Sequence, residues 1–142
     1  MGIASQHFLA NAVDSPSSAT TEAQSGVGGF SGCDAITIIA ELQGADDGTV
    51  DVFVQHSHDG VEWFDYVHFA QLGVGAAAVT YHYAPALNDS IVTIGSGTTP
   101  LLANGSVAGG HWMDFLRVVM VAAGSVDGPA EQTVRVHSVR KN

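Results

Sequence analysis

Four polar residues on and beside one predicted hairpin are of the types that bind metal ions. His56 and His58 are two positions apart and would share a face of a continuing strand, with Asp59 and His68 near them across the hairpin. Two histidines and a carboxylate can hold zinc or iron. His58 falls in the predicted turn, however, and the other histidines are scattered singly along the chain. We therefore expect ordinary surface histidines that form hydrogen bonds, and no bound metal.

Patterns typical of catalytic sites are weak in this sequence. There is no Gly-x-Ser-x-Gly nucleophile elbow, and the single cysteine, Cys33, has no obvious activating neighbour. The glycine-rich stretches 26–29 and 95–97 are interpreted as loops, because neither opens a recognisable helix that could hold phosphate. Asp46 and Asp47 lie in a predicted turn with few further oxygen ligands for calcium. We predict that the protein is not an enzyme and carries no cofactor.

The composition indicates strands joined by turns. Of 142 residues, 46% are hydrophobic and 13% are charged, which is too apolar for a disordered segment and too lightly charged for a long solvated helix. The 17 glycines and 4 prolines separate short apolar runs. A chain of this length can bury the core of one domain without disulfides, and a single cysteine argues against a disulfide-stapled secreted module.

Alternating apolar residues predict the strands that would position any site. We expect strands over 34–43, 49–56 and 63–69 to form an antiparallel meander. Further strands are predicted over 76–83, 90–94, 100–103, 111–123 and 131–139. Because one sheet alone would leave an apolar face in water, these seven or eight strands predict an all-β fold, an antiparallel β-sandwich of jelly-roll type. An up-and-down barrel is the alternative.

Two of these strands carry specific expectations about burial. Residues 111–123 are apolar on both faces, which is typical of a central strand. In the strand 49–56, Val52 and Val54 are expected to face inward, with Phe53 and Gln55 outward. An outward Phe53 would suit an interface with a partner, whereas the other placement is core beneath a long loop.

The first 32 residues differ from the rest of the chain. Residues 1–14 predict a first strand or an arm laid on a neighbour, and residues 15–32 are a connection rich in Ser, Thr, Ala and Gly. A connection this long is unusual inside a compact domain and often contacts a partner. We therefore divide the chain into an N-terminal arm and connection (1–32) and a β-sandwich domain (33–142), with Phe8 and Leu9 as candidate interface residues.

The sharpest local pattern is the stretch from Val52 to Trp63, which consists of a strand followed by Ser-x-Asp-Gly-x-x-Trp. The Asp-Gly pair is a strong hairpin signal. The side chains of Ser57 and Asp59 can cap the turn, and Gly60 can supply a positive φ angle. Trp63 is expected to fold back over the hairpin as a core residue.

This hairpin looks like one found in many β-sandwich proteins, including discoidin-like carbohydrate-binding domains. It is also similar to the Asp box of sialidases, although that motif has one more residue between Asp and Gly. With its continuation to Phe69 and the later stretch Phe115–Val118, the chain resembles small β-sandwich virion structural proteins of tailed bacteriophages, and among them most closely head decoration (cement) proteins. The resemblance covers residues 34–69 and 111–123.

The resemblance implies a protein that binds and stabilises the assembled capsid as an oligomer, usually a trimer. Its partners would be the major capsid protein of the same virion and further copies of itself. It would be made in the host cytoplasm and located on the outer surface of the capsid. Deleting residues 1–30 is then expected to leave the sandwich folded while abolishing capsid attachment or trimer formation.

Charge restricts the partners further. The formal net charge is −10, so neither nucleic acid nor an anionic membrane is expected to bind. Arg140 and Lys141 make the C-terminal end locally basic; they either meet a neighbouring acidic surface, such as another copy, or simply solvate a terminus. The N-terminus lacks the features of a cleaved signal peptide, and no stretch approaches the length of a membrane-spanning helix.

Two other functions are compatible with the sequence. A carbohydrate- or receptor-binding β-sandwich of a tail or fibre would stack sugar rings on exposed aromatic residues. The candidates are Trp63, Trp112, Tyr66, Tyr81 and Tyr83. We expect both tryptophans in the core, which removes the best two platforms. A head–tail joining protein or tail protein is the third possibility.

Overall fold

The computed structural model describes the backbone of residues 4–14, 21–33, 35–43, 49–71, 79–83, 101–108, 111–123 and 133–141. Within these ranges every regular element is a strand and there is no helix. The prediction of an all-β chain is confirmed for this part of the protein. The predicted strand at 90–94 lies outside the described residues.

Nine strands are present in the described ranges. They are β1 (Ala4–Asp14), β2 (Thr21–Ala23), β3 (Ala35–Gln43), β4 (Thr49–Ser57), β5 (Phe64–His68), β6 (Val79–Tyr83), β7 (Ser106–Val107), β8 (Phe115–Ala123) and β9 (Thr133–Lys141). The predicted number was seven or eight. Residues 101–103, predicted as part of a strand, form none; a turn at Asn104–Gly105 follows them, with Gly105 at φ 69°, and β7 begins after it.

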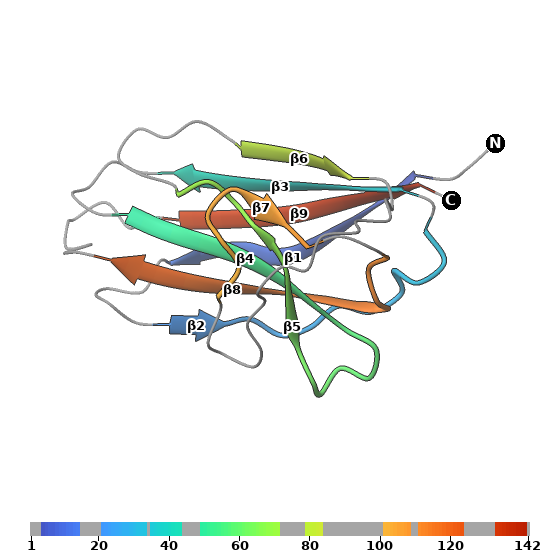
Figure 1. The fold of residues 1–142 in the computed structure, drawn as a ribbon. Coiled ribbons are helices and arrows are strands. Elements are labelled where there is room, and N and C mark those ends of the chain that lie inside the picture. The colour runs from blue at the N-terminus through green and yellow to red at the C-terminus, as the bar shows by residue number, and fades with distance from the viewer. Residues whose placement is uncertain are drawn as a thin grey trace.

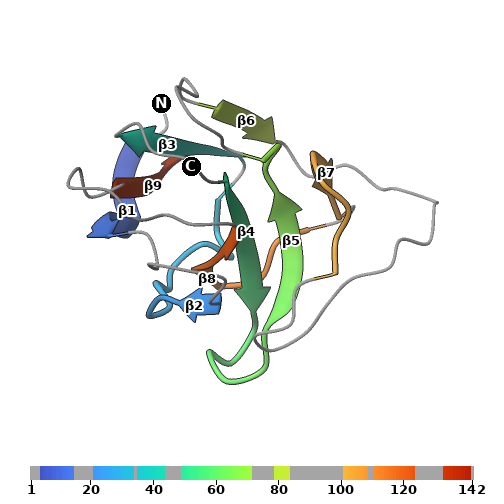
Figure 2. The same cartoon turned by 90° about the vertical axis from the view of Figure 1, so that its left-hand side faces the viewer.

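The strands form two antiparallel sheets, seen as two layers in Figures 1 and 2. The four-stranded sheet has the order β1-β9-β3-β6, and the five-stranded sheet has the order β2-β8-β4-β5-β7. Apart from the β4–β5 hairpin and its short neighbour β7, consecutive strands lie in different sheets. The chain therefore alternates between the two layers along most of its length.

This alternation contradicts the predicted meander. β4 does pair with β5, but its other neighbour is β8, and β3 pairs with β6 and β9 in the opposite sheet. Local alternation of apolar residues predicts a strand without identifying its partner. The apolar face of each strand needs only to point into the core. That condition is met when β3 and β4 are neighbours in one sheet, and equally when they lie in opposite sheets and face each other across the core, as observed.

The pairing is nested around the β4–β5 hairpin. Outward from that hairpin, β3 pairs with β6, β2 with β8 and β1 with β9. Two further pairs join alternate members of this nested series: β4 with β8 in the five-stranded sheet and β3 with β9 in the four-stranded sheet. The nesting brings the first and last strands together, with Ala4 opposite Lys141 at one end of the four-stranded sheet (Figure 1).

The main core lies between the two sheets. It is formed by inward side chains of β3, β4, β5 and β8 together with residues of the connecting segments. The buried members include Phe30, Ile36, Ile38, Val52, Val54, Tyr66, Phe69, Trp112, Leu116, Val118 and Met120. Removal of these apolar side chains from water is the main contribution that stabilises the fold.

A second, smaller cluster lies on the outer face of the five-stranded sheet. Phe53 and Val119 pack there beneath Leu102. β8 therefore has buried side chains on both faces and lies between β2 and β4, as predicted for a central strand. The predicted alternation in β4 is confirmed, because Val52 and Val54 face the main core while Phe53 and Gln55 face the other way. Both outward side chains are nevertheless buried, and Phe53 lies beneath Leu102.

The described part of residues 1–32 contributes to both sheets. β1 pairs with β9, and β2 pairs with β8. Phe30 is fully buried in the main core, and Val27 forms a β-bridge with Leu116. The strand alternative for residues 1–14 is therefore the one observed, and the described residues of the predicted arm pair with the body of the fold.

Two glycines in this segment lie where any side chain would collide with an aromatic ring. A Cβ atom on Gly26 would lie 2.4 Å from Cη2 of Trp63, and one on Gly28 would lie 2.8 Å from Cε1 of Phe115. Val27, between them, packs against the main core. The stretch predicted as a glycine-rich loop is thus joined to β8 by backbone hydrogen bonds, and its glycines leave room for two aromatic rings.

Candidate functional site

The loop between β4 and β5 is held by its own side chains. The hydroxyl of Ser57 accepts hydrogen bonds from the N–H groups of Gly60 (2.8 Å) and Asp59 (3.3 Å), and it donates to Oδ1 of Asp59 (2.9 Å). Asp59 Oδ1 also accepts from the N–H groups of Val61 (2.8 Å) and Glu62 (3.0 Å). Gly60 has a φ angle of 75°, which favours glycine. The predicted roles of Ser57, Asp59 and Gly60 are confirmed.

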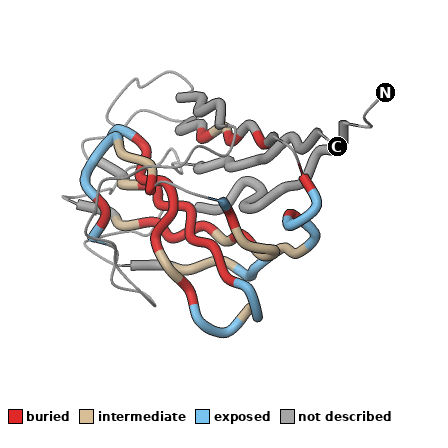
Figure 3. The backbone as a smooth tube through the Cα atoms, turned by 45° about the vertical axis from the view of Figure 1, so that its right-hand side comes forward, coloured by how far each residue is buried: buried red, intermediate tan, exposed pale blue. Residues whose placement is uncertain are grey.

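These donors also fix the charge of Asp59. Hydrogen bonds from the backbone of Val61, then that of Glu62 and the Ser57 hydroxyl, lower the pKa of the Asp59 carboxyl from 3.8 to about 2. The ring of His58, which is exposed, lies 3.7 Å from the second carboxylate oxygen. The loop is therefore a fixed, negatively charged turn at neutral pH, and Figure 3 shows it projecting from the buried strands.

Trp63 anchors the base of this loop. Its indole is 7% exposed, and the guanidinium carbon of Arg117 lies 4.6 Å from the ring centroid, a cation–π contact. Gly26 has no side chain, and the indole ring of Trp63 occupies the space that a Cβ atom at this position would need. The predicted burial of Trp63 is confirmed, whereas Arg117 as its partner was not predicted.

Arg117 begins a chain of polar groups on the outer face of the five-stranded sheet. Its Nε and Nη2 both donate to Oε1 of Gln55, at 2.9 and 2.8 Å. Gln55 Nε2 donates to Asp65 Oδ1 at 2.9 Å. Asp65 Oδ2 accepts from the N–H groups of Leu101 (2.7 Å) and Leu102 (3.0 Å). Gln55 and Asp65 are fully buried, so the chain of bonds ties the segment that begins at residue 101 to the sheet.

His68 makes a second attachment to the same segment. Its Nδ1 lies 2.7 Å from the carbonyl oxygen of Leu102, and its Nε2 lies 3.3 Å from Oδ1 of Asp51. The ring stacks on Phe53 with 3.8 Å between the centroids. Gln71 Nε2 donates to both carboxylate oxygens of Asp51, at 3.3 and 3.2 Å.

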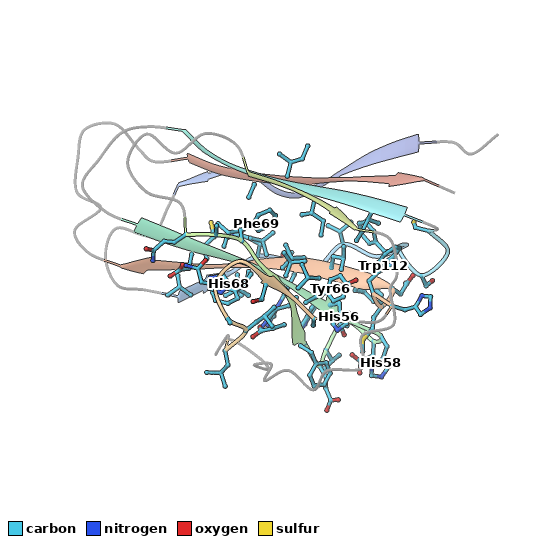
Figure 4. The ribbon with its side chains drawn as sticks, turned by 45° about the horizontal axis from the view of Figure 1, so that its top comes forward. His56, His58, Tyr66, His68, Phe69 and Trp112 are labelled. Carbon is cyan, nitrogen blue, oxygen red and sulfur yellow. The ribbon has the colours of Figure 1, made fainter. Side chains whose placement is uncertain are left out.

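His56 lies on the opposite face of the sheet, where its ring stacks on Tyr66 with 4.6 Å between the centroids (Figure 4). It is buried, and among the described residues its Nδ1 has no hydrogen-bond partner. Burial lowers the pKa of His56 from 6.5 to about 4, because the charged ring would lose its hydration. His56 is therefore neutral in the folded protein at neutral pH.

The structure does not assemble the metal-binding group considered from sequence. His56 stacks on Tyr66 of the main core, His68 stacks on Phe53 of the outer cluster, and His58 and Asp59 lie in the exposed loop. Across the described ranges, no group of three or more His, Cys, Asp or Glu side chains is placed to hold a metal ion. The buried histidines serve packing and hydrogen bonding instead.

The predicted interface residues fall in two places. Phe8 and Leu9 lie on β1, where the pairing with β9 is irregular after Phe8, and Arg140 and Lys141 lie at the end of β9. These four therefore share one strand pair, although their side chains lie outside the described part. Phe53 is in the other sheet and only 6% exposed, so the structure shows the second of the two placements considered for it. Its ring is core, covered by the segment that contains Leu102.

Sequence reasoning missed the buried polar network. Its members come from three different strands and a connecting segment, and no spacing along the chain relates them. One signal was available: Arg117 is the single polar residue of the otherwise apolar strand β8. A buried polar group needs a partner, so Arg117 indicated that a polar side chain of a neighbouring strand lay nearby.

Two large apolar side chains stand out at the surface of the described residues. Val61, in the loop between β4 and β5, is 77% exposed, and Leu101, at the start of the segment bound by Asp65, is 60% exposed. Both lie in segments whose backbone is held by a buried or hydrogen-bonded carboxylate. The molecule thus presents apolar side chains on fixed loops.

Comparisons with known proteins found no family model, no curated protein and no solved structure that matches the chain. In the portion of the protein described here, no helix is long and apolar enough to cross a membrane.

Proposed function

We propose that the protein is a structural protein of a bacteriophage virion that binds the assembled head as an oligomer and stabilises it, as a decoration (cement) protein does. The observation that carries the proposal is the use of buried polar groups on the outer face of the five-stranded sheet. Arg117, Gln55 and Asp65 bond to one another and to the backbone of a surface segment. These groups hold the backbone of residues 101 and 102 in one conformation, and we assign them no catalytic role.

A rigid surface suits attachment to another protein. The loop of residues 57–62 and the segment from residue 101 are both fixed by hydrogen bonds before any partner arrives. Association then costs less conformational entropy than it would with mobile loops. Val61 and Leu101 add exposed apolar area to these two segments.

The fold we propose is the β-sandwich of jelly-roll type. When the two-residue β7 is set aside, the remaining strands follow the order first, eighth, third, sixth in one sheet and second, seventh, fourth, fifth in the other. That order arises when one long hairpin is rolled into two sheets, and the nested pairing supports it. Viral capsid domains and lectins both use jelly rolls, so fold alone does not choose between them.

The aromatic residues favour the virion function over the carbohydrate-binding alternative. Trp63, Trp112 and Tyr66 are buried, and the indole N–H of Trp112 donates to the carbonyl of Phe30 at 2.7 Å. Buried rings offer no platform for a sugar. The side chains of Tyr81 and Tyr83 lie outside the described part.

The proposed partners are further copies of the chain, as a homotrimer, and the major capsid protein. Three of the four basic residues, Arg135, Arg140 and Lys141, belong to β9, on a chain of net charge −10. A basic strand on an acidic body offers charge complementarity to an acidic neighbour. The proposal places the protein on the outer surface of the capsid and includes neither an enzymatic activity nor a cofactor, nucleic acid or membrane.

The proposal is tested by light scattering and co-sedimentation. We expect the purified protein to have the mass of a trimer and to sediment with undecorated phage heads, but not with heads that already carry their decoration protein. A monomer that ignores undecorated heads would overturn the proposal. Binding to isolated tails or necks, with none to heads, would select the joining or tail alternative.

A further inference from the structure

An asparagine–glycine pair lies in the turn that precedes β7. The N–H of Ser106 donates to the carbonyl of Ala103 at 3.1 Å, which closes a β-turn. Asn104 and Gly105 occupy its two central positions, and Gly105 has a φ angle of 69°, which suits glycine at the second of them. Residues 103–105 are exposed. The pair is therefore held in a defined turn and is open to water.

The contacts of this pair leave two reactive groups available to each other. These groups are the main-chain nitrogen of Gly105 and the labile side-chain amide of Asn104. The N–H of Gly105 takes no part in the bond that closes the turn, and among the described residues it has no acceptor. Asn104 is bonded through Oδ1, which accepts from the N–H of Gln71 at 3.1 Å, so Nδ2 is not tied down. Attack of the Gly105 nitrogen on Cγ of Asn104 would break no hydrogen bond of either nitrogen.

The bond from Gln71 also favours that attack. When a nitrogen adds to Cγ of Asn104, negative charge develops on Oδ1. A donor that already faces this oxygen stabilises the developing charge, as the donors of an oxyanion hole do. Glycine at position 105 has no side chain to obstruct the approach of its nitrogen.

We propose that Asn104 is a site of spontaneous covalent modification, in which the side-chain amide is converted to a carboxylate. The nitrogen of Gly105 forms a bond with Cγ as the bond between Cγ and Nδ2 breaks. Nδ2 leaves as ammonia with the proton from the Gly105 nitrogen, and a cyclic succinimide remains. Water then adds to either carbonyl of this ring. Opening of the ring gives aspartate, or isoaspartate, in which the main chain runs through the side-chain carbon.

The Asp59–Gly60 pair of the loop between β4 and β5 has the opposite arrangement. The N–H of Gly60 donates to the hydroxyl of Ser57 at 2.8 Å, so this nitrogen is engaged. Backbone hydrogen bonds hold the pKa of the Asp59 carboxyl at about 2. The ionised carboxylate is a poor target for a nucleophile, because it already carries the negative charge that attack would add. We therefore expect Asn104 to react while Asp59 does not.

Either product changes the surface around the turn. Both add one negative charge to a chain whose net charge is already −10. Isoaspartate also lengthens the main chain between residues 103 and 106, which disrupts the hydrogen bond that closes the turn. The exposed side chain of Leu101 lies on the same segment. The reaction needs only water and proceeds in the free protein, whatever its partners.

Digestion with an endoprotease that cleaves before aspartate distinguishes every form. In the unmodified chain, cleavage before Asp89 and Asp114 releases residues 89–113 as one fragment. Aspartate at position 104 creates a new cleavage site within this fragment. Isoaspartate resists the protease, so the fragment stays whole but has the mass of the acid. The same digest reports on Asp59, because isoaspartate at that position would block cleavage before it.

We expect both products of Asn104 to accumulate when the folded protein is kept in mildly alkaline buffer at physiological temperature. Asn104 is the one asparagine of the sequence that is followed by glycine, so fragments with Asn11 or Asn88 should keep their masses, and cleavage before Asp59 should stay complete. If residues 89–113 kept their mass while a synthetic peptide of residues 101–108 was converted, the proposal would be overturned. Equal conversion at Asn88 would also contradict it.

Two substitutions at one position test the activating donor. Gln71→Pro removes the N–H that faces Oδ1 of Asn104, and we expect conversion to slow on the order of tenfold, the effect of one hydrogen bond to a developing charge. Gln71→Ala loses the same side chain but keeps the N–H, so it should retain the wild-type rate. Equal rates in the two variants would show that this N–H does not activate Asn104.

Discussion

At the scale of single residues, two side chains make the fold sensitive to acid, for different reasons. Burial strips the hydration from the His56 ring, so the protonated form is disfavoured and its pKa is about 4 instead of 6.5. Asp59 accepts several hydrogen bonds, so its ionised form is favoured and its pKa is about 2 instead of 3.8. Below its ordinary pKa, each group binds protons more readily in the unfolded chain, and acid therefore favours unfolding in both cases.

The contribution of His56 is lost first as the pH falls. Between pH 6.5 and about 4, His56 binds a proton in the unfolded chain but stays neutral in the folded protein. This difference lowers the free energy of unfolding by up to about 3 kcal/mol. We expect this fall in urea unfolding measured at about pH 7 and about pH 4.5. His56→Phe, which keeps a ring against Tyr66, should flatten it, whereas His58→Asn should not. An unchanged slope in His56→Phe would refute the assignment.

A second residue-scale prediction concerns the close approach of Gly26 to Trp63. A Cβ atom there would lie 2.4 Å from the indole, so Gly26→Ala must displace the ring or the backbone of the segment. We expect a loss of about 1 to 3 kcal/mol in the free energy of unfolding and a shift in tryptophan fluorescence. Gly32→Ala is the matched control, because a Cβ atom there meets nothing within 4 Å. Equal effects of the two substitutions would show that the indole contact is not responsible.

At the scale of elements, β4 and β8 form the centre of the molecule because side chains cover them on both faces. The inner face carries apolar residues such as Val54 and Val118, whereas the outer face combines the Phe53 cluster with the Arg117–Gln55–Asp65 chain. A buried carboxyl group destabilises the fold unless its oxygens accept hydrogen bonds. Asp65 accepts the N–H groups of both Leu101 and Leu102, so the attachment of these two residues to the sheet depends on it.

We predict that Asp65→Asn detaches residues 101 and 102 from the sheet. The new NH₂ group must face either Nε2 of Gln55 or the N–H groups of residues 101 and 102, so at least one hydrogen bond is replaced by two donors facing each other. The expected cost is about 2 kcal/mol, together with faster proteolysis within residues 101–108. Glu62→Gln makes the same chemical change at an exposed position, where effects stay within about 0.5 kcal/mol. Intact protease resistance in Asp65→Asn would contradict this role.

At the scale of the whole molecule, the nested pairing makes the two ends of the chain part of the fold. β1 closes the four-stranded sheet against β9, and the following segment supplies β2 and the core residue Phe30. Most pairs other than the β4–β5 hairpin join strands far apart in sequence, so much loop-closure entropy is lost before they form. The first 30 residues are thus needed to complete both sheets.

The structure changes the expected effect of deleting residues 1–30 on folding. The truncated chain would lack two strands and the buried ring of Phe30, and it should lose cooperative urea unfolding. Removal of residues 1–3 alone, which precede β1, should leave the transition intact. A truncated chain that unfolds with the midpoint and slope of the full chain would show that β1 and β2 are dispensable.

Sequence reasoning succeeded where the decisive interactions are local. The strands of the β4–β5 hairpin and the turn between them were predicted, because Ser57, Asp59 and Gly60 act on backbone groups at most three residues away. The central position of β8 followed from its two apolar faces. The burial of Trp63 was also predicted, from its place after the turn.

Sequence patterns thus predicted an all-β class for the described chain and one hairpin with its capped turn. Three features became visible only in the folded molecule: β3 pairs with β9 in the four-stranded sheet, Phe53 is buried, and Arg117 bonds to Gln55, 62 positions away. The physical reason is the range of the interactions. A period of two predicts two faces for each strand, but which neighbour covers each face depends on how all the strands share the available core.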